Sequence, residues 1–342
     1  MKEKQKNVIK EDEKIKWLQK NSEPIFFIVL PIIGLIVGFF IGRIDFFQLK
    51  YEEGTEIHLG TYKYINPLLM CETGGVLSSN FEYFKDKVDN LIKDNISNGK
   101  VNSASFYFRD LNNGPWFNIN SDEKFFPASM LKVPAMITVL KEAENNPSIF
   151  SNEIEYGGTS IISQQHFKPQ KDLEKNKVYN VSDLLDLMIK YSSNEAALVL
   201  VEMFGKEKII STYSDLGIDE PGTSPENAMT ISKYASFFRI LFNSSYLSRE
   251  MSEKALDLLT KTTFAQGIVA GVPSNIEVAH KFGEREAVDS SEVQLHDCGI
   301  VYYPNHPYLL CIMTRGNNFN DLSGTIKDIS SLVYQEADRN FK

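Results

Sequence analysis

Residues 125–134 read FFPASMLKVP, and we expect the rest of the chain to be organised around this stretch. Ser129 and Lys132 are three residues apart within it, so on a helix their side chains lie on one face and can touch. The residues that follow are mostly apolar, as in a buried helix, and Pro134 is tolerated only near a helix start or at a kink. The pattern predicts a loop that turns into a buried helix at Ser129 and runs to about Ala143.

This Ser-x-x-Lys pair has the chemistry of an acylation site. A serine hydroxyl becomes a good nucleophile when a neighbouring base accepts its proton, and a buried lysine can be that base because burial lowers its pKa. The N-terminus of a helix adds N–H groups and positive potential where an oxyanion would form. The same spacing recurs at Ser121 and Lys124. That pair lies in a polar stretch, which we interpret as a solvated loop.

The length and charge of the chain limit the classes it can belong to. Its 342 residues leave room for one large domain with additional segments, or for two domains. The hydrophobic content of 42% is ordinary for a globular core. A net charge of −9 argues against a nucleic-acid-binding protein, which normally carries a basic face. We therefore expect no nucleic-acid partner.

The three cysteines are Cys71, Cys298 and Cys311. Their spacing matches no metal motif, and an odd number cannot all pair. The sequence therefore predicts neither a zinc site nor a disulfide framework, and the cysteines are interpreted as buried or incidental thiols. The sequence does not show whether Cys71 is modified.

An uninterrupted apolar stretch, IFFIVLPIIGLIVGFFIG, occupies residues 25–42 and is just long enough to span a bilayer core. A cleaved signal peptide is disfavoured by the long polar segment 1–24 and by the lack of a small-x-small cleavage site. A buried soluble helix is disfavoured because the stretch has no polar face. Lysines are concentrated before it, which predicts a single-pass anchor in the cell membrane with a cytoplasmic N-terminus and an extracytoplasmic domain.

Residues 43–77 show little helical period and are interpreted as a juxtamembrane connector, so the folded domain is expected at 78–342. Within it, hydrophobic periodicity predicts helices and strands. The expected strands are 103–111, 116–119, 277–282, 293–303 and 308–314. The expected helices are 79–98, 129–143, 181–190, 196–204, 206–215, 230–243, 248–260 and 322–337. Strands at both ends with a helical block between them indicate an α+β fold in which the two ends share one sheet.

Two further short patterns follow the Ser129 stretch. Ser192-Ser193-Asn194 lies between two expected helices, where a hydroxyl and an amide could project together. Lys281-Phe282-Gly283 ends an apolar strand, where a lysine head and an approachable backbone would line a sheet edge. Each pattern is common by chance, so the prediction of an active site depends on the three patterns occurring together in this order.

With these patterns in this order, the chain from about residue 79 to the end resembles the class A β-lactamase and penicillin-binding-protein superfamily. That family is marked by S-x-x-K, then S-D-N, then K-T-G or K-S-G. GIVAGVP at 267–273 and LHDCGIVYYP at 295–304 add to the resemblance. It implies a β-lactamase-like fold, with a five-stranded antiparallel sheet flanked by helices and an all-helical subdomain that carries Ser192 and Asn194.

The resemblance implies the catalytic roles. Ser129 would be the acylated nucleophile and Lys132 its proton acceptor. Ser192 would relay the proton to the leaving nitrogen. The oxyanion would lie between the backbone N–H groups of Ser129 and Glu284, since acyl transfer needs oxyanion donors beside the nucleophile.

The resemblance also implies how substrate is held. Asn194 would bind the substrate amide, Lys281 would supply positive potential near the substrate carboxylate, and Gly283 would present backbone to the substrate. The substrate would be a β-lactam or a peptidoglycan D-alanyl stem peptide, and neither a metal nor a cofactor is expected.

Three departures from the family pattern bear on activity. Ser193 stands where the family has aspartate. Phe282 replaces the hydroxyl residue that would grip the substrate carboxylate. The segment between Asn194 and Lys281 is short, and Glu220 and Glu226 do not match the spacing of the glutamate that activates the deacylating water. We interpret both glutamates as solvated loop carboxylates.

His280, His296 and Asp297 could suggest a metal site or a histidine-based triad. Their order and spacing match no metal motif, and Lys132 already fills the role of base, so structural roles are expected.

The sequence thus predicts a membrane-anchored, extracytoplasmic serine acyl-hydrolase with slow deacylation. The alternative is a non-catalytic domain of the same fold that binds cell wall or senses β-lactams. Phe282 and the unmatched loop glutamate favour that alternative, whereas Ser129, Lys132 and the other motif residues favour the enzyme.

Overall fold

The computed structural model describes residues 56–58, 60, 62–71, 79–112, 114–158, 165–218, 228–287 and 291–341, which belong to one compact unit, Glu53–Lys342. The predicted cytoplasmic tail and the anchor at 25–42 lie outside these residues. Within the described ranges, no helix combines the length and apolar character needed to cross a bilayer.

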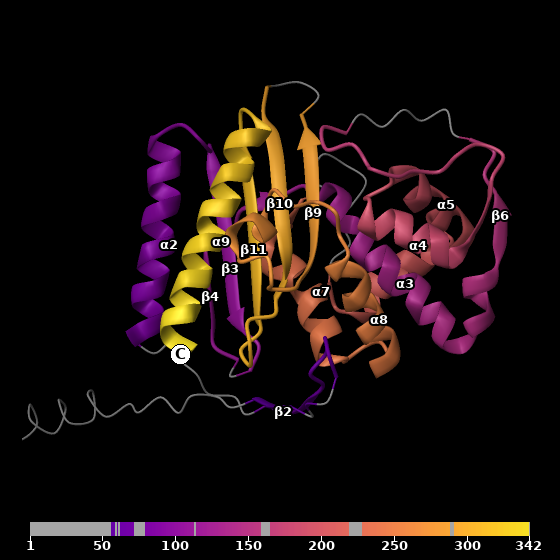
Figure 1. Cartoon of the computed structure of the whole chain (residues 1–342), viewed down its shortest axis with the longest axis horizontal. Helices are drawn as coiled ribbons and strands as arrows, with labels where there is room; N and C mark the ends of the chain where they lie inside the picture. Colours follow the sequence, from indigo (N-terminus) through magenta and orange to yellow (C-terminus); the bar gives the residue numbers. More distant parts are fainter. Residues whose placement is uncertain are drawn as a thin grey trace, which may run out of the picture. The chain divides into compact units, whose positions relative to one another are not determined.

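The central sheet consists of five antiparallel strands in the order β4-β3-β11-β10-β9 (Figure 1). The strands are β3 (Ser103–Asp110), β4 (Trp116–Ile119), β9 (Val278–Glu286), β10 (Val293–Val301) and β11 (Tyr308–Gly316). Early strands therefore pair with late ones, which confirms the α+β fold with a shared sheet. β9 extends four residues beyond the predicted end at Phe282, because register pairing with β10 continues to Glu286.

The described helices are named in chain order. They are α2 (Ser79–Ser97), η1 (Ala128–Leu131), α3 (Lys132–Asn145), η2 (Pro147–Ser151), α4 (Val181–Lys190), α5 (Asn194–Phe204), α6 (Lys206–Asp215), α7 (Ile231–Asn243), α8 (Arg249–Thr260), η3 (Ile268–Gly271) and α9 (Phe319–Phe341). Short two-stranded pairs join β1 (Glu56–His58) to β2 (Leu68–Cys71), β5 (Lys124–Phe125) to β8 (Met229–Thr230), and β6 (Glu153–Glu155) to β7 (Val178–Asn180). The hydrophobic pattern had not predicted these three pairs, because strands of two to four residues carry too little period.

Helices cover both faces of the sheet. The cluster on one face includes Val88 of α2, Ile329 of α9 and Leu310 of β11, and Figure 1 shows α9 lying across the strands. The cluster on the other face includes Phe238 of α7 and Leu309 of β11. Successive residues of a strand point to opposite faces, so β11 is apolar along nearly its whole length because both of its faces are buried.

The helices α3, α4 and α5 lie beyond the β9 edge of the sheet (Figure 1), and α6 packs on α3 and α5 to complete a helical block. Asn180 begins α4 with a reciprocal capping box, in which it accepts the N–H of Asp183 and its own N–H is bound by the Asp183 carboxylate. Ser193 caps α5 by accepting the N–H of Ala196 at 2.9 Å. These two caps determine where the chain turns between α4 and α5, and Ser192 lies at that turn.

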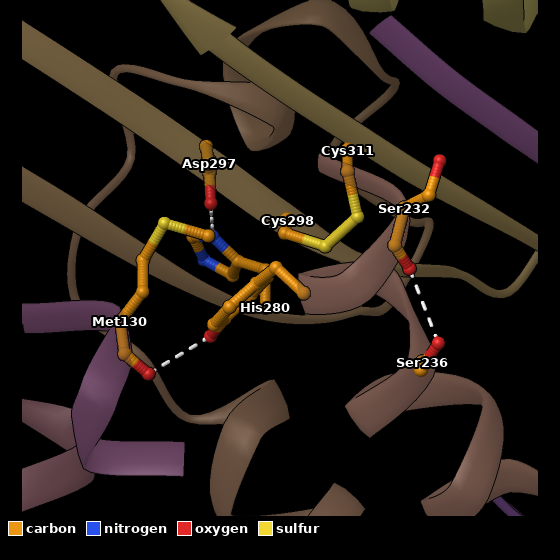
Figure 2. The surroundings of a disulfide bond; sticks show 8 residues. Met130, Ser232, Ser236, His280, Asp297, Cys298 and Cys311 are labelled. Atoms are coloured by element: carbon orange, nitrogen blue, oxygen red, sulfur yellow. Dashed lines mark hydrogen bonds and ion pairs between the residues drawn. A yellow bond between two sulfur atoms is a disulfide. The ribbon is translucent and has the colours of Figure 1, made fainter. Parts of the chain in front are cut away.

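The interpretation of all three cysteines as thiols was wrong for two of them. Cys298 of β10 and Cys311 of β11 lie opposite each other in register, and a disulfide joins them inside the sheet (Figure 2). The sequence separation of 13 gave no sign of this pairing. Only the register of two adjacent strands brings the two sulfurs together.

Candidate active site

Ser129 lies on the 3-10 turn η1, immediately before α3, and is therefore at the N-terminal end of the helix as predicted. Two side chains of strand β10 bind the backbone of Phe126, which lies just before this turn. The Gln294 side chain accepts the Phe126 N–H at 3.1 Å, and His296 Nε2 donates to the Phe126 carbonyl at 3.0 Å. Burial lowers the pKa of His296 to about 3, so the ring is neutral and its Nδ1 accepts the N–H of Thr314 at 3.2 Å. His296 therefore has a structural role beside the nucleophile.

Gly283 is the point at which β9 touches the nucleophile turn. A Cβ atom at this position would lie 2.3 Å from the carbonyl oxygen of Pro127 and 3.1 Å from the backbone nitrogen of Met130. Both neighbours are backbone atoms, which cannot rotate away. The glycine therefore allows the backbone of β9 to lie directly against η1.

Lys132 occupies the centre of the site and is 5% exposed. Its Nζ atom lies 2.6 Å from Ser129 Oγ, 2.5 Å from Asn194 Oδ1 and 3.4 Å from Ser192 Oγ. Burial lowers the pKa of Lys132 to about 7, although the negative charges of Glu284 and Asp172 act in the opposite direction. Near neutral pH, a substantial fraction of this amine carries no charge.

Ser192 connects the two lysines. It is fully buried, and its Oγ atom accepts from Lys281 Nζ at 2.9 Å. Its backbone has a φ of 58°, in the left-handed region that non-glycine residues rarely occupy. This conformation points the side chain back between Lys132 and Lys281, so the strain lies at the position where the three groups meet.

Lys281 is also fully buried, and besides Ser192 it donates to the Phe282 carbonyl oxygen at 3.1 Å. Burial is the main reason that the pKa of Lys281 is well below its ordinary value, and the neighbouring charge of Lys132 lowers it further. The structure thus joins Ser129, Lys132, Ser192, Asn194 and Lys281 in one continuous set of contacts drawn from η1, α3, the α4–α5 turn, α5 and β9.

Comparison with known proteins shows the family of this chain. The model of the Beta-lactamase enzyme family matches residues 84–337. The chain belongs to this family. Its curated relatives include β-lactamase VEB-1 of Pseudomonas aeruginosa, which is 21% identical over 238 residues covering 64% of this chain and 77% of VEB-1. β-Lactamase OXY-1 of Klebsiella oxytoca is 20% identical over 206 residues, covering 56% and 68% of the two chains.

Solved structures of the β-lactamase family share the fold. A mutant of PBP-A, solved as its acyl-enzyme complex with penicillin G, has a TM-score of 0.62 at 20% identity, covering 75% of this chain and 97% of that one. The class A β-lactamase from Mycobacterium abscessus has a TM-score of 0.62 at 20% identity, covering 74% and 98%. At this level of identity the likeness shows the fold alone.

The structure accounts for the first departure from the β-lactamase family pattern. Ser193 Oγ donates to the Asp172 carboxylate while it accepts the N–H of Ala196. Asp172 in turn accepts the N–H of Leu173 at 2.8 Å and acts electrostatically on Lys132. A carboxylate is therefore supplied from another segment, next to the position where the family has its aspartate. No sequence motif had indicated Asp172.

The second departure, Phe282, is 4% exposed and stacks on Phe264 with ring centroids 4.1 Å apart. Glu284, two residues further along β9, is half-buried, and burial raises its pKa. The two carboxylate oxygens of Glu284 accept the N–H of Phe167 at 3.1 and 3.2 Å. The sequence had singled out Glu284 only for its backbone N–H, and the contact of its side chain was not foreseen.

The remaining candidates lie away from the reacting groups or outside the described chain. His280 Nδ1 pairs with Asp297 at 2.8 Å (Figure 2). Asp297 also accepts the N–H of Ile268 at 2.8 Å, which ties β9 and β10 to η3. Both residues are buried, which fits the expected structural role. Glu220 and Glu226 lie outside the described residues.

Proposed function

We propose that the chain is a serine acyl-hydrolase in which Ser129 attacks a lactam or amide carbonyl and forms an acyl-enzyme. The observation that carries the proposal is the continuous contact from Ser129 through Lys132 and Ser192 to Lys281. Two buried lysines are costly to retain, and their burial gives each a lowered pKa. Ionisable groups with pKa values perturbed by burial are concentrated at functional sites.

The contacts of Lys132 are those that a neutral amine can make. A neutral amine has one lone pair and two N–H groups. Lys132 Nζ lies 2.6 Å from Ser129 Oγ, so in the neutral state its lone pair can accept the Ser129 proton, while the N–H groups donate to Asn194 Oδ1 at 2.5 Å and Ser192 Oγ at 3.4 Å. In this state Lys132 is ready to remove the Ser129 proton as the Oγ–carbon bond forms.

The contacts of Ser192 direct the proton to the leaving group. A hydroxyl has two lone pairs and one O–H donor. With Lys132 and Lys281 donating to the lone pairs, the Ser192 proton points toward the substrate. When the carbon–nitrogen bond breaks, Ser192 gives this proton to the leaving nitrogen and is reprotonated by Lys132, which had taken a proton from Ser129. The net result is the transfer of one proton from the nucleophile to the leaving group.

The oxyanion would lie between the backbone N–H groups of Ser129 and Glu284. The tight contact of Gly283 with Pro127 and Met130 supports this assignment, because it brings the backbone of β9 next to η1. Asn194 would hold the amide of the acyl portion. The substrate class we propose is a β-lactam or a D-alanyl peptide, supported by family membership and by a structural neighbour solved as a penicillin G acyl-enzyme.

Covalent labelling tests the proposal. A fluorophosphonate, which reacts with activated serines, and a fluorescent penicillin are each incubated with the wild type and with Ser129→Ala. We expect fluorophosphonate to label Ser129 in the wild type, and the label to disappear in Ser129→Ala. Ser121→Ala is the matched control because it has the same Ser-x-x-Lys spacing, and it should label normally. Equal labelling of Ser129→Ala and wild type by fluorophosphonate would reject the proposed nucleophile.

We further propose that residues 25–42 anchor the hydrolase domain to the cell membrane, facing outward. The support is the apolar run and the excess of lysine before it. Protease added to spheroplasts should digest the domain, and the mature protein should retain residues 1–42. A mature N-terminus beyond Gly42, or protection of the domain from protease, would reject this arrangement.

A further inference from the structure

The side of the site that would receive the leaving group has an unusual lining. If Ser192 protonates the leaving atom, the leaving half of the substrate extends from Ser192 along β9, past Lys281, Phe282 and Glu284. This inference rests on the proposed function. The chemistry of those three side chains then decides which leaving groups the site accepts.

Lys281 is poorly placed to bind an anion. The side chain of Lys281 is buried. Its Nζ atom donates to Ser192 Oγ and to the Phe282 carbonyl, and lies 4.3 Å from the centroid of the Phe282 ring. Burial and the proximity of Lys132 also hold its pKa well below the ordinary value, which favours the neutral amine. Lys281 therefore has two of its hydrogen bonds already made within the protein, and its lowered pKa reduces the positive charge that a substrate carboxylate would meet.

The place next to Lys281 is apolar. Phe282 belongs to an aromatic cluster made of His166, Phe167, Phe264, Phe282 and Phe319. Phe282 stacks on Phe264 at 4.1 Å and meets the edge of Phe167 at 6.0 Å, while Phe167 lies 5.8 Å from Phe319. These rings fill the position where a hydroxyl would otherwise donate to an anion, and none of the phenylalanine side chains can donate a hydrogen bond.

Glu284 adds negative charge at the same place. Its carboxylate binds the N–H of Phe167 with both oxygens, as an ionised carboxylate, which only accepts hydrogen bonds, is suited to do. Gln165, two residues before Phe167, donates to the Ser192 carbonyl at 3.4 Å. The segment 165–167 is therefore tied to both Ser192 and Glu284 and holds this carboxylate beside the path of the leaving group.

We propose that the acyl donor of this site carries no free carboxylate on its leaving half, which is instead neutral or cationic, such as an ester-capped β-lactam or a D-alanyl peptide with an amidated leaving residue. A carboxylate would face the like charge of Glu284, and like charges brought together at a binding site reject the wrong partner. Aromatic faces and a carboxylate together favour a neutral or positively charged group.

Three forms of one acyl donor test the proposal: benzylpenicillin as the free acid, as its methyl ester and as its diethylaminoethyl ester, which is cationic. Their second-order rates of adduct formation at Ser129 are measured by mass spectrometry of the intact protein. We expect the two esters to react at least about tenfold faster than the free acid, because only the acid meets like charge.

Two variants assign the preference to Glu284. Glu284→Gln should raise the rate of the free acid relative to the methyl ester, because it removes the charge and keeps the shape. Glu286→Gln is the matched control, since it removes a carboxylate from an exposed position on the same face of the same strand. It should leave the ratio of the rates unchanged. Phe282→Thr should shift the ratio in the same direction as Glu284→Gln.

A free acid that reacts as fast as or faster than the methyl ester overturns the proposal, as does a failure of all three forms to react. A ratio that Glu284→Gln leaves unchanged also overturns it. Fluorophosphonate labelling of Ser129 separates these results from failure of the proposed function. Labelling with no ester preference rejects the leaving-group proposal alone, whereas loss of labelling rejects the nucleophile and with it both proposals.

Discussion

Lys132 Nζ lies 2.6 Å from Ser129 Oγ, inside a site where burial lowers the pKa of the lysine to about 7. Below that pKa the amine is protonated and cannot accept the serine proton; above it the amine is neutral and can. The acylation chemistry of the site should therefore follow the protonation of this one group.

We expect the rate of fluorophosphonate labelling of Ser129 to rise with pH through about 7 and to level off above it, falling to about a tenth of the plateau near pH 6. The pKa of Glu284 is raised by burial, so Glu284→Gln serves as the control. In that variant the rise of the rate with pH should persist but move to lower pH, because the negative charge of Glu284 raises the pKa of Lys132. A rate independent of pH from about 5 to about 9 would contradict the assignment of Lys132 as the base.

Gly283→Ala should push β9 away from the nucleophile turn. Its Cβ would lie 2.3 Å from the Pro127 carbonyl oxygen, so the backbone must move. We expect a loss of about 1–3 kcal/mol in the free energy of unfolding. The rate of acylation should fall by about 10²-fold, because the oxyanion donors no longer face the reacting carbonyl. Urea denaturation and labelling kinetics measure the two effects.

Gly324→Ala is the control for this substitution. Gly324 lies within α9, and a Cβ there would meet no atom within 4 Å. Alanine should stabilise that helix by about 0.5–1 kcal/mol and leave acylation unchanged. If Gly283→Ala behaved like Gly324→Ala, the close contact between β9 and η1 would be wrong.

Ser193→Asp should destabilise the chain even though it restores the residue of the family pattern. The buried Ser193 hydroxyl donates to Asp172, and an aspartate in its place would bring two carboxylates together. We expect the free energy of unfolding to fall by about 1–3 kcal/mol. In an Asp172→Asn background the same substitution should cost much less, because the second charge is gone. Equal costs in both backgrounds, measured by urea denaturation, would show that the two side chains are not coupled.

A β-lactam adduct at Ser129 should be long-lived. Acylation uses Ser129, Lys132 and the oxyanion donors, whereas deacylation needs a base that positions a water. Glu220 and Glu226 lack the family's spacing for that base, and general-base assistance is worth about 10²–10⁴-fold. In a mass-spectrometry time course with benzylpenicillin methyl ester, we expect the adduct to persist for minutes after excess reagent is removed. Rapid hydrolysis with no trapped adduct would show that another group acts as the base.

The parts of this protein that sequence alone determined are those in which spacing along the chain equals spacing in space. Ser129 and Lys132 meet because they are three residues apart at a helical turn, and the long helices and strands follow from their hydrophobic repeat. The order of the three short motifs also indicated the family and the α+β fold. These predictions needed only local geometry and a known pattern.

Tertiary structure decided what no local repeat encodes. The carboxylate next to Ser193 comes from Asp172, 21 residues away, and Glu284 binds the backbone of Phe167 across a separation of 117 residues. Cys298 and Cys311 are joined only because β10 and β11 pair in that register. Each of these contacts depends on where packed elements place a side chain relative to a distant segment. Such contacts also determine whether the site binds or repels a carboxylate, because the charge and shape around Lys281 come from several separate parts of the chain.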